Sequence, residues 1–152
     1  MVDIVDQSTR SRIMSKIRSK NTLPEIRIRK SLFALGLRYR LHNTKLPGKP
    51  DIVLPKYNAV IFFNGCFWHG HDCHLFKMPE TRIEFWKAKF QRNKKKDNEN
   101  MLALKELGWR IMTVWECAFR GRGKKRDVEI KRLSARILQW LNSNISVAEI
   151  RG

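Results

Sequence analysis

The residues best suited to chemistry lie in one short run, Cys66-Phe67-Trp68-His69-Gly70-His71-Asp72-Cys73-His74. It contains two cysteines, three histidines and a carboxylate, side chains that commonly bind transition metals. Two large aromatic side chains lie among them, and aromatic rings in a loop offer flat surfaces on which bases can stack. The run therefore predicts a metal site next to an aromatic surface.

A structural zinc site explains the cysteines. Cys66 and Cys73 lie among polar residues in a predicted loop, and Cys117, the only other cysteine, follows a predicted strand that could bring it to the loop. Three thiolates and one imidazole would form a closed tetrahedral zinc site, which holds a loop and does no chemistry. Burial of three free cysteines is the alternative. Spacing leaves three candidates for the fourth ligand: His69, His71 and His74.

A second group could hydrolyse a phosphodiester bond. Asp51 opens a short apolar strand after Pro50, and an aspartate there can hold Mg²⁺ against a phosphate. His69, if it does not bind zinc, can activate water near neutral pH. The alternatives are a turn residue at Asp51 and a zinc ligand or surface residue at His69. Glu25 is a weaker candidate, because the pattern that Thr22 opens already explains it as part of a helix cap.

The charge of the chain indicates a polyanionic partner. It has 32 Lys and Arg against 14 Asp and Glu, a formal net charge of +18 and a pI near 10.5. DNA or RNA is the expected partner, through phosphate contacts and counterion release, and a merely soluble basic or ribosomal protein is the alternative. The apolar runs are too short to span a membrane, and no signal peptide is visible. An odd number of cysteines argues against a disulfide framework and favours a reducing, intracellular compartment.

The elements that must position these residues alternate between helices and short strands. Periodicity and end signals predict helices over residues 22–35, 81–107 and 127–141. Short apolar runs predict strands over residues 37–41, 51–54, 59–63 and 109–115, with frayed final residues. This order predicts one α/β domain, a mixed sheet flanked by helices, preceded by a basic arm or helix at residues 1–20 that contacts nucleic acid.

The aromatic residues divide between core and surface. Phe67 and Trp68 are adjacent and point in different directions, which makes burial of both unfavourable. Trp86 shares helical spacing with Ile83 and Phe90, so core packing competes there with base stacking. The segment 91–100 has no apolar residue and is expected to face solvent or phosphates. Three other tryptophans are expected in the core: Trp109, Trp115 and Trp140.

Four stretches resemble the very-short-patch-repair (Vsr) DNA mismatch endonuclease family. They are PGKPD at 47–51, VIFFNGCFWHGHDCHLFKMP at 60–79, TRIEFWKAKF at 81–90 and LGWRIMTVWECAFRGR at 107–122. The resemblance implies a restriction-endonuclease-like fold and a Mg²⁺-dependent enzyme that nicks one strand of duplex DNA beside the thymine of a T·G mismatch, the product of 5-methylcytosine deamination. It also implies a monomer in the bacterial cytoplasm, associated with the nucleoid, with other repair proteins as further partners.

The resemblance also assigns roles to residues. Asp51 resembles the Mg²⁺ ligand, His69 the general base, and Glu25 an acidic residue that supports the metal site through water. The structural zinc ligands would be Cys66, His71, Cys73 and Cys117. The residues that resemble DNA contacts are the aromatic wedge of Phe67, Trp68 and Trp86, the minor-groove residue Met14, and Lys89 and Asn93.

Two positions depart from the family pattern. The family commonly has threonine at position 63 and histidine at position 64, where this chain has Phe63 and Asn64. A Mg²⁺ contact through the backbone carbonyl of Phe63 would survive the change, whereas a side-chain contact would not. Asn64 cannot take a proton but can donate a hydrogen bond to a phosphate. We expect an active enzyme. The alternatives are a restriction-type nuclease with another DNA target and a non-catalytic zinc module that binds distorted DNA.

Overall fold

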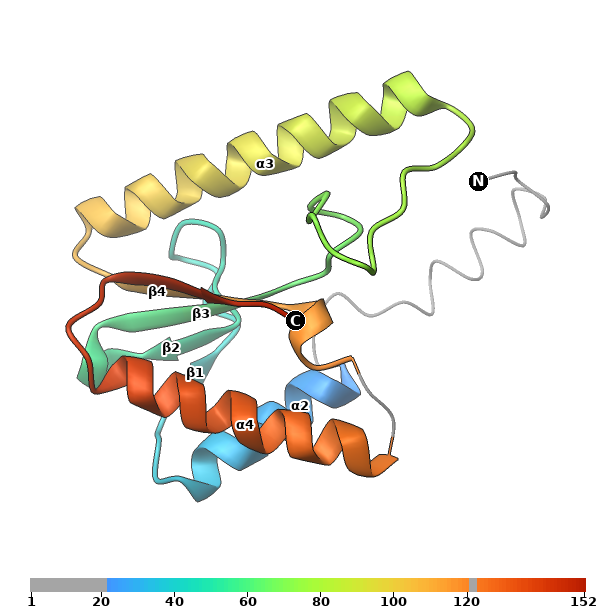
Figure 1. Ribbon diagram of the computed structural model, residues 1–152. Coiled ribbons are helices and arrows are strands. Elements are labelled where there is room, and N and C mark those ends of the chain that lie inside the picture. The colour runs from blue at the N-terminus through green and yellow to red at the C-terminus, as the bar shows by residue number, and fades with distance from the viewer. Residues whose placement is uncertain (1–21, 121–122) are drawn as a thin grey trace.

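The structure, a computed structural model, describes residues 22–120 and 123–152. In this part of the chain, three helices flank one mixed five-stranded sheet in the order β1-β2-β3-β4-β5 (Figure 1). The strands are β1 (Arg40–Leu41), β2 (Ile52–Leu54), β3 (Ala59–Asn64), β4 (Arg110–Trp115) and β5 (Val147–Ile150). The first three strands form an antiparallel meander, and β4 and β5 continue the sheet in parallel with β3.

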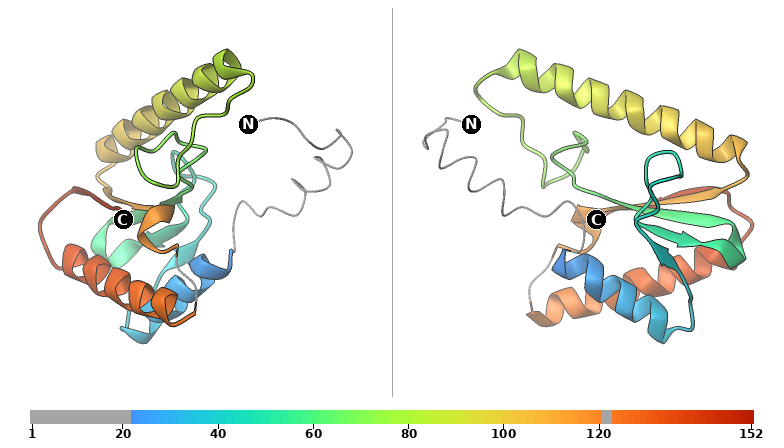
Figure 2. Two further views of the ribbon diagram at one scale, coloured as in Figure 1. Left: turned by 45° about the vertical axis from the view of Figure 1, so that its right-hand side comes forward. Right: turned by 180° about the vertical axis from the view of Figure 1, so that it is seen from behind.

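The helices form two layers. The helix α3 (Ile83–Glu106) connects β3 to β4 and lies over one face of the sheet, while α2 (Leu23–Ala34) and α4 (Gly123–Leu141) lie together against the other (Figure 2). Parallel neighbouring strands need a crossover of this kind, because the chain must return to the same end of the sheet. α3 therefore lies over the sheet at the C-terminal end of β3.

Side chains that alternate along the strands build a core on each face. Ile61 of β3 packs with Ile28 and Leu32 of α2 in the larger core, which also includes Ile137 of α4. Val60, the next residue along β3, packs with a smaller core on the α3 face. This period of two is the usual consequence of strand geometry. Residues next to these core positions, on the same face of β2 and β3, therefore point into the space below α3.

Several sequence predictions need correction. The final residues do not fray, because Val147–Ile150 pairs in parallel with β4 as β5. Thr22 is the N-cap of α2 but makes no side-chain cap hydrogen bond, so the Thr22 half of the predicted cap is absent. Phe33 and Leu35, two apolar residues of the predicted helix at 22–35, are exposed. The predicted helix at 127–141 begins four residues earlier, at Gly123.

The basic arm and its residue Met14 lie outside the described residues. Over residues 22–120 and 123–152, none of the helices has the length and apolar character needed to cross a bilayer.

Candidate functional site

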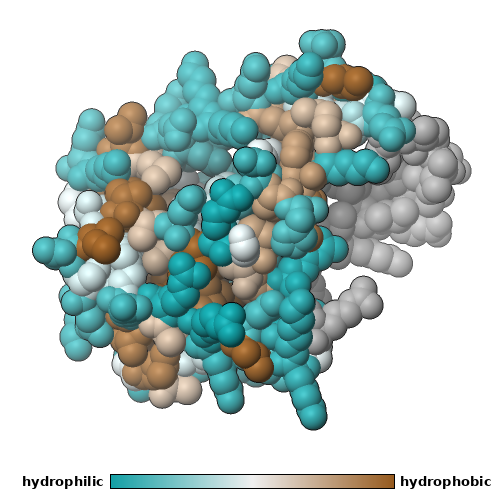
Figure 3. Space-filling view, viewed as in Figure 1, coloured by the Kyte–Doolittle hydropathy of each residue, from teal (hydrophilic) through white to brown (hydrophobic). Residues whose placement is uncertain are grey.

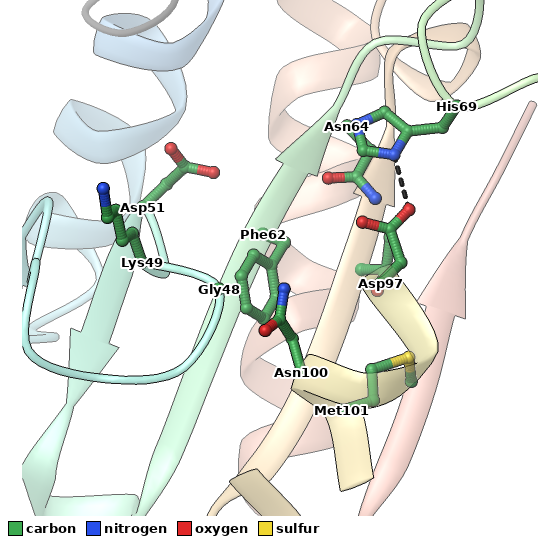
Figure 4. Close-up of a pocket in the computed structure, with 10 residues that line it drawn as sticks. Gly48, Lys49, Asp51, Phe62, Asn64, His69, Asp97, Asn100 and Met101 are labelled. Carbon is green, nitrogen blue, oxygen red and sulfur yellow. Dashed lines mark hydrogen bonds and ion pairs between the residues drawn. The ribbon is translucent and has the colours of Figure 1, made fainter. Parts of the chain in front are cut away.

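A cavity of about 200 Å³ lies below α3, where β3 ends (Figure 4). Asp51 reaches it from the residue before β2, and Asn64 from the last position of β3. Antiparallel pairing places the start of β2 beside the end of β3, and the Phe63 backbone N–H donates to Asp51 Oδ2 at 2.8 Å. His69 comes from the loop that follows β3, and Asp97 from the middle of α3. Residues separated by up to 46 positions therefore converge on one cavity.

Asp51 belongs to a partly buried cluster of ionisable side chains. His42 Nδ1 lies 3.9 Å from Asp51 Oδ1, and His42 Nε2 lies 3.7 Å from Glu25 Oε1. Arg29 Nη1 lies 3.9 Å from the same Glu25 oxygen. Burial raises the pKa of Asp51 to about 6, the Phe63 N–H opposes this shift, and the nearby Glu25 carboxylate adds to it. Two carboxylates and an imidazole form a donor set that fits a divalent cation, whose charge would stabilise the ionised form of Asp51.

Glu25 reaches this cluster from the first turn of α2. Glu25 is only 4% exposed, and its Oε1 lies 3.7 Å from His42 Nε2. The sequence prediction undervalued Glu25 because a capping pattern supplied a local explanation. The structure brings Glu25 and Asp51 together, as the family resemblance implies.

The His69 imidazole is held by Asp97. Nδ1 of His69 lies 2.6 Å from Asp97 Oδ2, the interaction marked by a dashed line in Figure 4. A carboxylate at this distance accepts a hydrogen bond from Nδ1–H and leaves Nε2 as the nitrogen that can take a proton from water. His69 is not among the residues that gather as a metal cluster in the described part of the chain. It therefore remains free to act as a base.

Sequence reasoning missed Asp97 and His42. Asp97 lies in the apolar-free segment 91–100, which was expected to face solvent or phosphates. One signal was available: Trp86, Phe90, Asn93 and Asp97 follow one another at spacings of four, three and four residues, so they lie on one face of α3. For His42 no local pattern exists, since it approaches Asp51 only through the pairing of β1 with β2.

The side chains of the two residues that depart from the family pattern face opposite sides of the sheet. Asn64 lines the cavity near His69 (Figure 4). The Phe63 side chain faces the opposite side of the sheet, where its ring packs edge-on against Phe119 with centroids 6.4 Å apart. Phe63 therefore offers the site only backbone groups.

The predicted zinc ligands also meet in the fold. Ligand atoms of all four residues lie within 4.8 Å of one another: Cys66, His71, Cys73 and Cys117. Cys117 comes from the short helix after β4, and its Sγ lies 3.7 Å from His71 Nδ1. Burial, with the neighbouring thiols, raises the pKa of Cys66 to about 12. A soft, buried set of three sulfurs and one imidazole suits a tetrahedral Zn²⁺, which would hold the thiols as thiolates.

Trp115 supports the cluster at the end of β4. Its ring stacks on the His71 imidazole with centroids 3.8 Å apart, and its indole N–H donates to Glu149 Oε2 of β5 at 3.0 Å. Trp115 and Trp109 are half-buried, whereas Trp140 is only 5% exposed and belongs to the larger core. The core prediction is therefore confirmed for Trp140, holds in part for Trp109, which packs against the smaller core, and is too strong for Trp115.

The aromatic residues form one cluster below the N-terminal half of α3. The Phe67 centroid lies 5.2 Å from that of Trp68, 5.3 Å from that of Trp86 and 5.5 Å from that of Phe90. Trp68 is 37% exposed, while Phe67 and Trp86 are half-buried and Phe90 is buried. Figure 3 shows apolar atoms reaching the surface between hydrophilic regions. The cluster thus has a packed interior, formed by Phe67, Trp86 and Phe90, and one exposed ring, that of Trp68.

The α3 residues predicted to contact DNA differ in their surroundings. Lys89 is half-buried and lies three residues after Trp86 in α3. The Asn93 side-chain amide donates to the Trp68 carbonyl at 2.6 Å, so it fixes the loop that carries the tryptophan. The basic side chains beyond it are exposed along the helix: Lys94, Lys95 and Lys96.

Comparison with known proteins identifies the family. The family described as DNA mismatch endonuclease Vsr matches residues 2–75. The chain is 43% identical over 150 residues to the DNA mismatch endonuclease Vsr of Escherichia coli, covering 99% of this chain and 94% of that protein. It is 43% identical over 117 residues to a type II nicking enzyme of Xanthomonas oryzae, covering 77% of this chain and 86% of that enzyme, and 42% identical over 127 residues to one of Neisseria meningitidis, covering 84% and 91%. With the cavity, the Cys/His cluster and the aromatic cluster in place, the chain belongs to the Vsr family of DNA mismatch endonucleases.

Proposed function

We propose that this endonuclease nicks one strand of duplex DNA beside the thymine of a T·G mismatch, and that it requires Mg²⁺. The observation that carries the proposal is the meeting of Asp51 with the His69–Asp97 pair in one cavity. Nearly full-length similarity to a mismatch endonuclease supports the choice of substrate.

Asp51 would hold Mg²⁺, with the backbone carbonyl of Phe63 as a further ligand and Glu25 supporting the site through water. The cation would neutralise charge that develops on the phosphate. Asn64 and Lys49, which also line the cavity, offer donors to the phosphate oxygens. Asn64 supplies its hydrogen bond without a positive charge, so we expect weaker transition-state stabilisation there than from a protonated histidine.

His69 would accept the proton of the attacking water at Nε2. Asp97 would accept a hydrogen bond from Nδ1–H, fix the tautomer and stabilise the imidazolium that forms.

Zn²⁺ on Cys66, His71, Cys73 and Cys117 would fix the loop and take no part in the reaction. The same loop carries His69 and the wedge residues Phe67 and Trp68, with Trp86 from α3. Stacking on an unpaired base contributes roughly 1–3 kcal/mol, against an unstacking cost of a few kcal/mol per step. A mismatch is already easier to open than a matched pair, which favours wedge insertion there.

We further propose a restriction-endonuclease-like core that begins at residue 21, with residues 1–20 as a DNA-contacting arm in which Met14 enters the minor groove. The end predicted for this core, residue 145, lies before β5, so the core extends through Ile150. Lys89 and Asn93 would lie near the DNA beside the wedge. A monomer bound to the bacterial nucleoid, with other repair proteins as partners, fits this activity.

Strand-resolved cleavage of end-labelled duplexes tests the proposal. Duplexes with a T·G mismatch in varied flanking sequence, and matched C·G controls, are incubated with the enzyme and Mg²⁺. We expect a nick beside the mismatched thymine only, lost in Asp51→Asn and His69→Gln. Asp127→Asn, on a side chain 62% exposed in α4, should keep full activity.

Two results would contradict the proposal. Equal cutting of matched and mismatched DNA would indicate a nuclease with another target. Tight mismatch binding without Mg²⁺-dependent cutting would indicate a binding module.

A further inference from the structure

His42 occupies a backbone position set by its neighbour Asp51. It follows β1, and its N–H donates to the Asp51 carbonyl at 3.0 Å. Its φ of 48° lies in the left-handed region, which non-glycine residues adopt uncommonly and which is often found at functional sites. Leu41 pairs with Ile52 in the antiparallel ladder, so the next residue, His42, lies opposite Asp51. The backbone therefore delivers an imidazole to the carboxylate that would hold the cation.

The side-chain geometry fits one ion shared by both residues. An ion about 2.1 Å from each of two ligands leaves them about 3 Å apart at a right angle and about 4.2 Å apart when they lie opposite. His42 Nδ1 and Asp51 Oδ1 are 3.9 Å apart, within this range. Ligand atoms of Glu25, His42 and Asp51 all lie within 4.8 Å of one another.

We propose that His42 is a ligand of the Asp51 cation through Nδ1, and that it shifts the ion preference of the site from Mg²⁺ toward transition-metal ions. The inference rests on the proposed function, in which Asp51 holds the catalytic cation, and it adds to that function a nitrogen ligand and a metal preference.

Glu25 supports the ligating form of His42. An imidazole that binds a metal through Nδ1 carries its proton on Nε2, and ligating histidines usually donate that second N–H to a carboxylate or carbonyl. Glu25 Oε1 lies 3.7 Å from Nε2. Glu25 would therefore orient His42 in addition to its role through water.

Arg29 balances the charge. Its Nη1 lies 3.9 Å from Glu25 Oε1 and donates to His42 Nε2 at 3.4 Å in the tautomer that carries the proton on Nδ1. Ligation through Nδ1 would move that proton to Nε2, which would then face Glu25. The guanidinium offsets the charge of Glu25, so the cation would meet one net negative charge, from Asp51, and a neutral nitrogen. Mg²⁺ selects oxygen ligands and charge, whereas imidazole suits later first-row ions. The donor set thus favours ions such as Co²⁺ over Mg²⁺.

Cation binding to the zinc-loaded full chain, without DNA, tests the inference. Titration calorimetry gives the affinities for Co²⁺ and Mg²⁺, and pulsed EPR of bound Mn²⁺ reports a directly coordinated nitrogen. In His42→Gln, which offers an oxygen of similar reach, we expect Co²⁺ affinity to fall about tenfold or more and Mg²⁺ affinity to change less than about threefold. The nitrogen signal of the wild type should disappear.

The remaining histidines provide controls. The chain has 4 histidines, and His71 would be committed to zinc. The nitrogen signal should persist in His69→Gln, which keeps the cation site, and in His74→Gln, on the exposed end of the loop.

Three results would overturn the inference: a wild type without the nitrogen signal, a signal that survives His42→Gln, or equal effects of that variant on both ions. The wild-type spectrum is decisive even if His42→Gln fails to fold. Failure of the proposed function would appear separately, as wild-type enzyme that does not nick T·G duplexes in Mg²⁺.

Discussion

Replacing Asp97 with asparagine tests whether the α3 carboxylate activates His69. The substitution keeps the shape and removes the charge that faces Nδ1 across 2.6 Å. A hydrogen bond to a charged group contributes about 1.5–3 kcal/mol. The Asp97 side chain is 34% exposed, so solvent screening favours the lower part of that range. A loss of about 1.5–2 kcal/mol from the transition state corresponds to a rate lower by roughly 10- to 30-fold.

Single-turnover nicking of a T·G duplex at saturating enzyme measures this rate separately from DNA binding. Glu99→Gln is the matched control, because it removes an equal charge from an exposed position two residues further along the same helix. Any general gain in DNA affinity from lost negative charge should appear in both variants. The reasoning is refuted if Asp97→Asn nicks within about threefold of Glu99→Gln, or if its slower rate is matched by weaker mismatch binding.

Three further outcomes are expected. Cys73→Ser should lose zinc by metal analysis after mild chelation and should melt at a lower temperature by circular dichroism, because the closed ligand set loses a thiolate; full zinc retention would contradict the assignment. Asn93→Ala removes the bond to the Trp68 carbonyl and should destabilise the fold by about 1 kcal/mol in urea, with weaker mismatch discrimination; unchanged discrimination would show that this bond does not hold the wedge. Arg110→Ala removes the guanidinium that donates to the carbonyls of Trp140, Leu141, Ser143 and Ile145. The free energy of unfolding in urea should fall by about 3 kcal/mol, while the nicking rate per folded molecule stays unchanged. A fall of less than about 1 kcal/mol would mean that water replaces the guanidinium as the donor.

The sequence predicted those parts of the fold whose signals are local. The apolar run at 59–63 became β3, and the helical spacing around Trp86 became α3, because each pattern matches the period of one element. β5 was missed because Val147–Ile150 carries only a weak apolar pattern, and its pairing with β4 depends on a crossover of the whole helix α4.

The same difference between local and distant signals separates the site residues that the sequence predicted from those that it did not. The Cys/His run was predictable because its ligands cluster in sequence, and only Cys117 had to be supplied by the fold. Asp97 and His42 were not predicted, because their roles depend on which distant residue each one faces. Glu25 was misjudged because a favourable local explanation, the helix cap, competed with a buried position that only tertiary packing creates.

The backbone contact of Phe63 to Asp51 has a consequence for how such enzymes diverge. Its N–H holds the carboxylate, while its side chain is selected by the core on the far side of the sheet. The main chain is the same for every amino acid except proline, so this position can drift among residues that suit the core without disturbing the carboxylate. Comparing side chains alone would count the residue as a lost functional group. Proline is the substitution that evolution should exclude there, since it alone removes the donor.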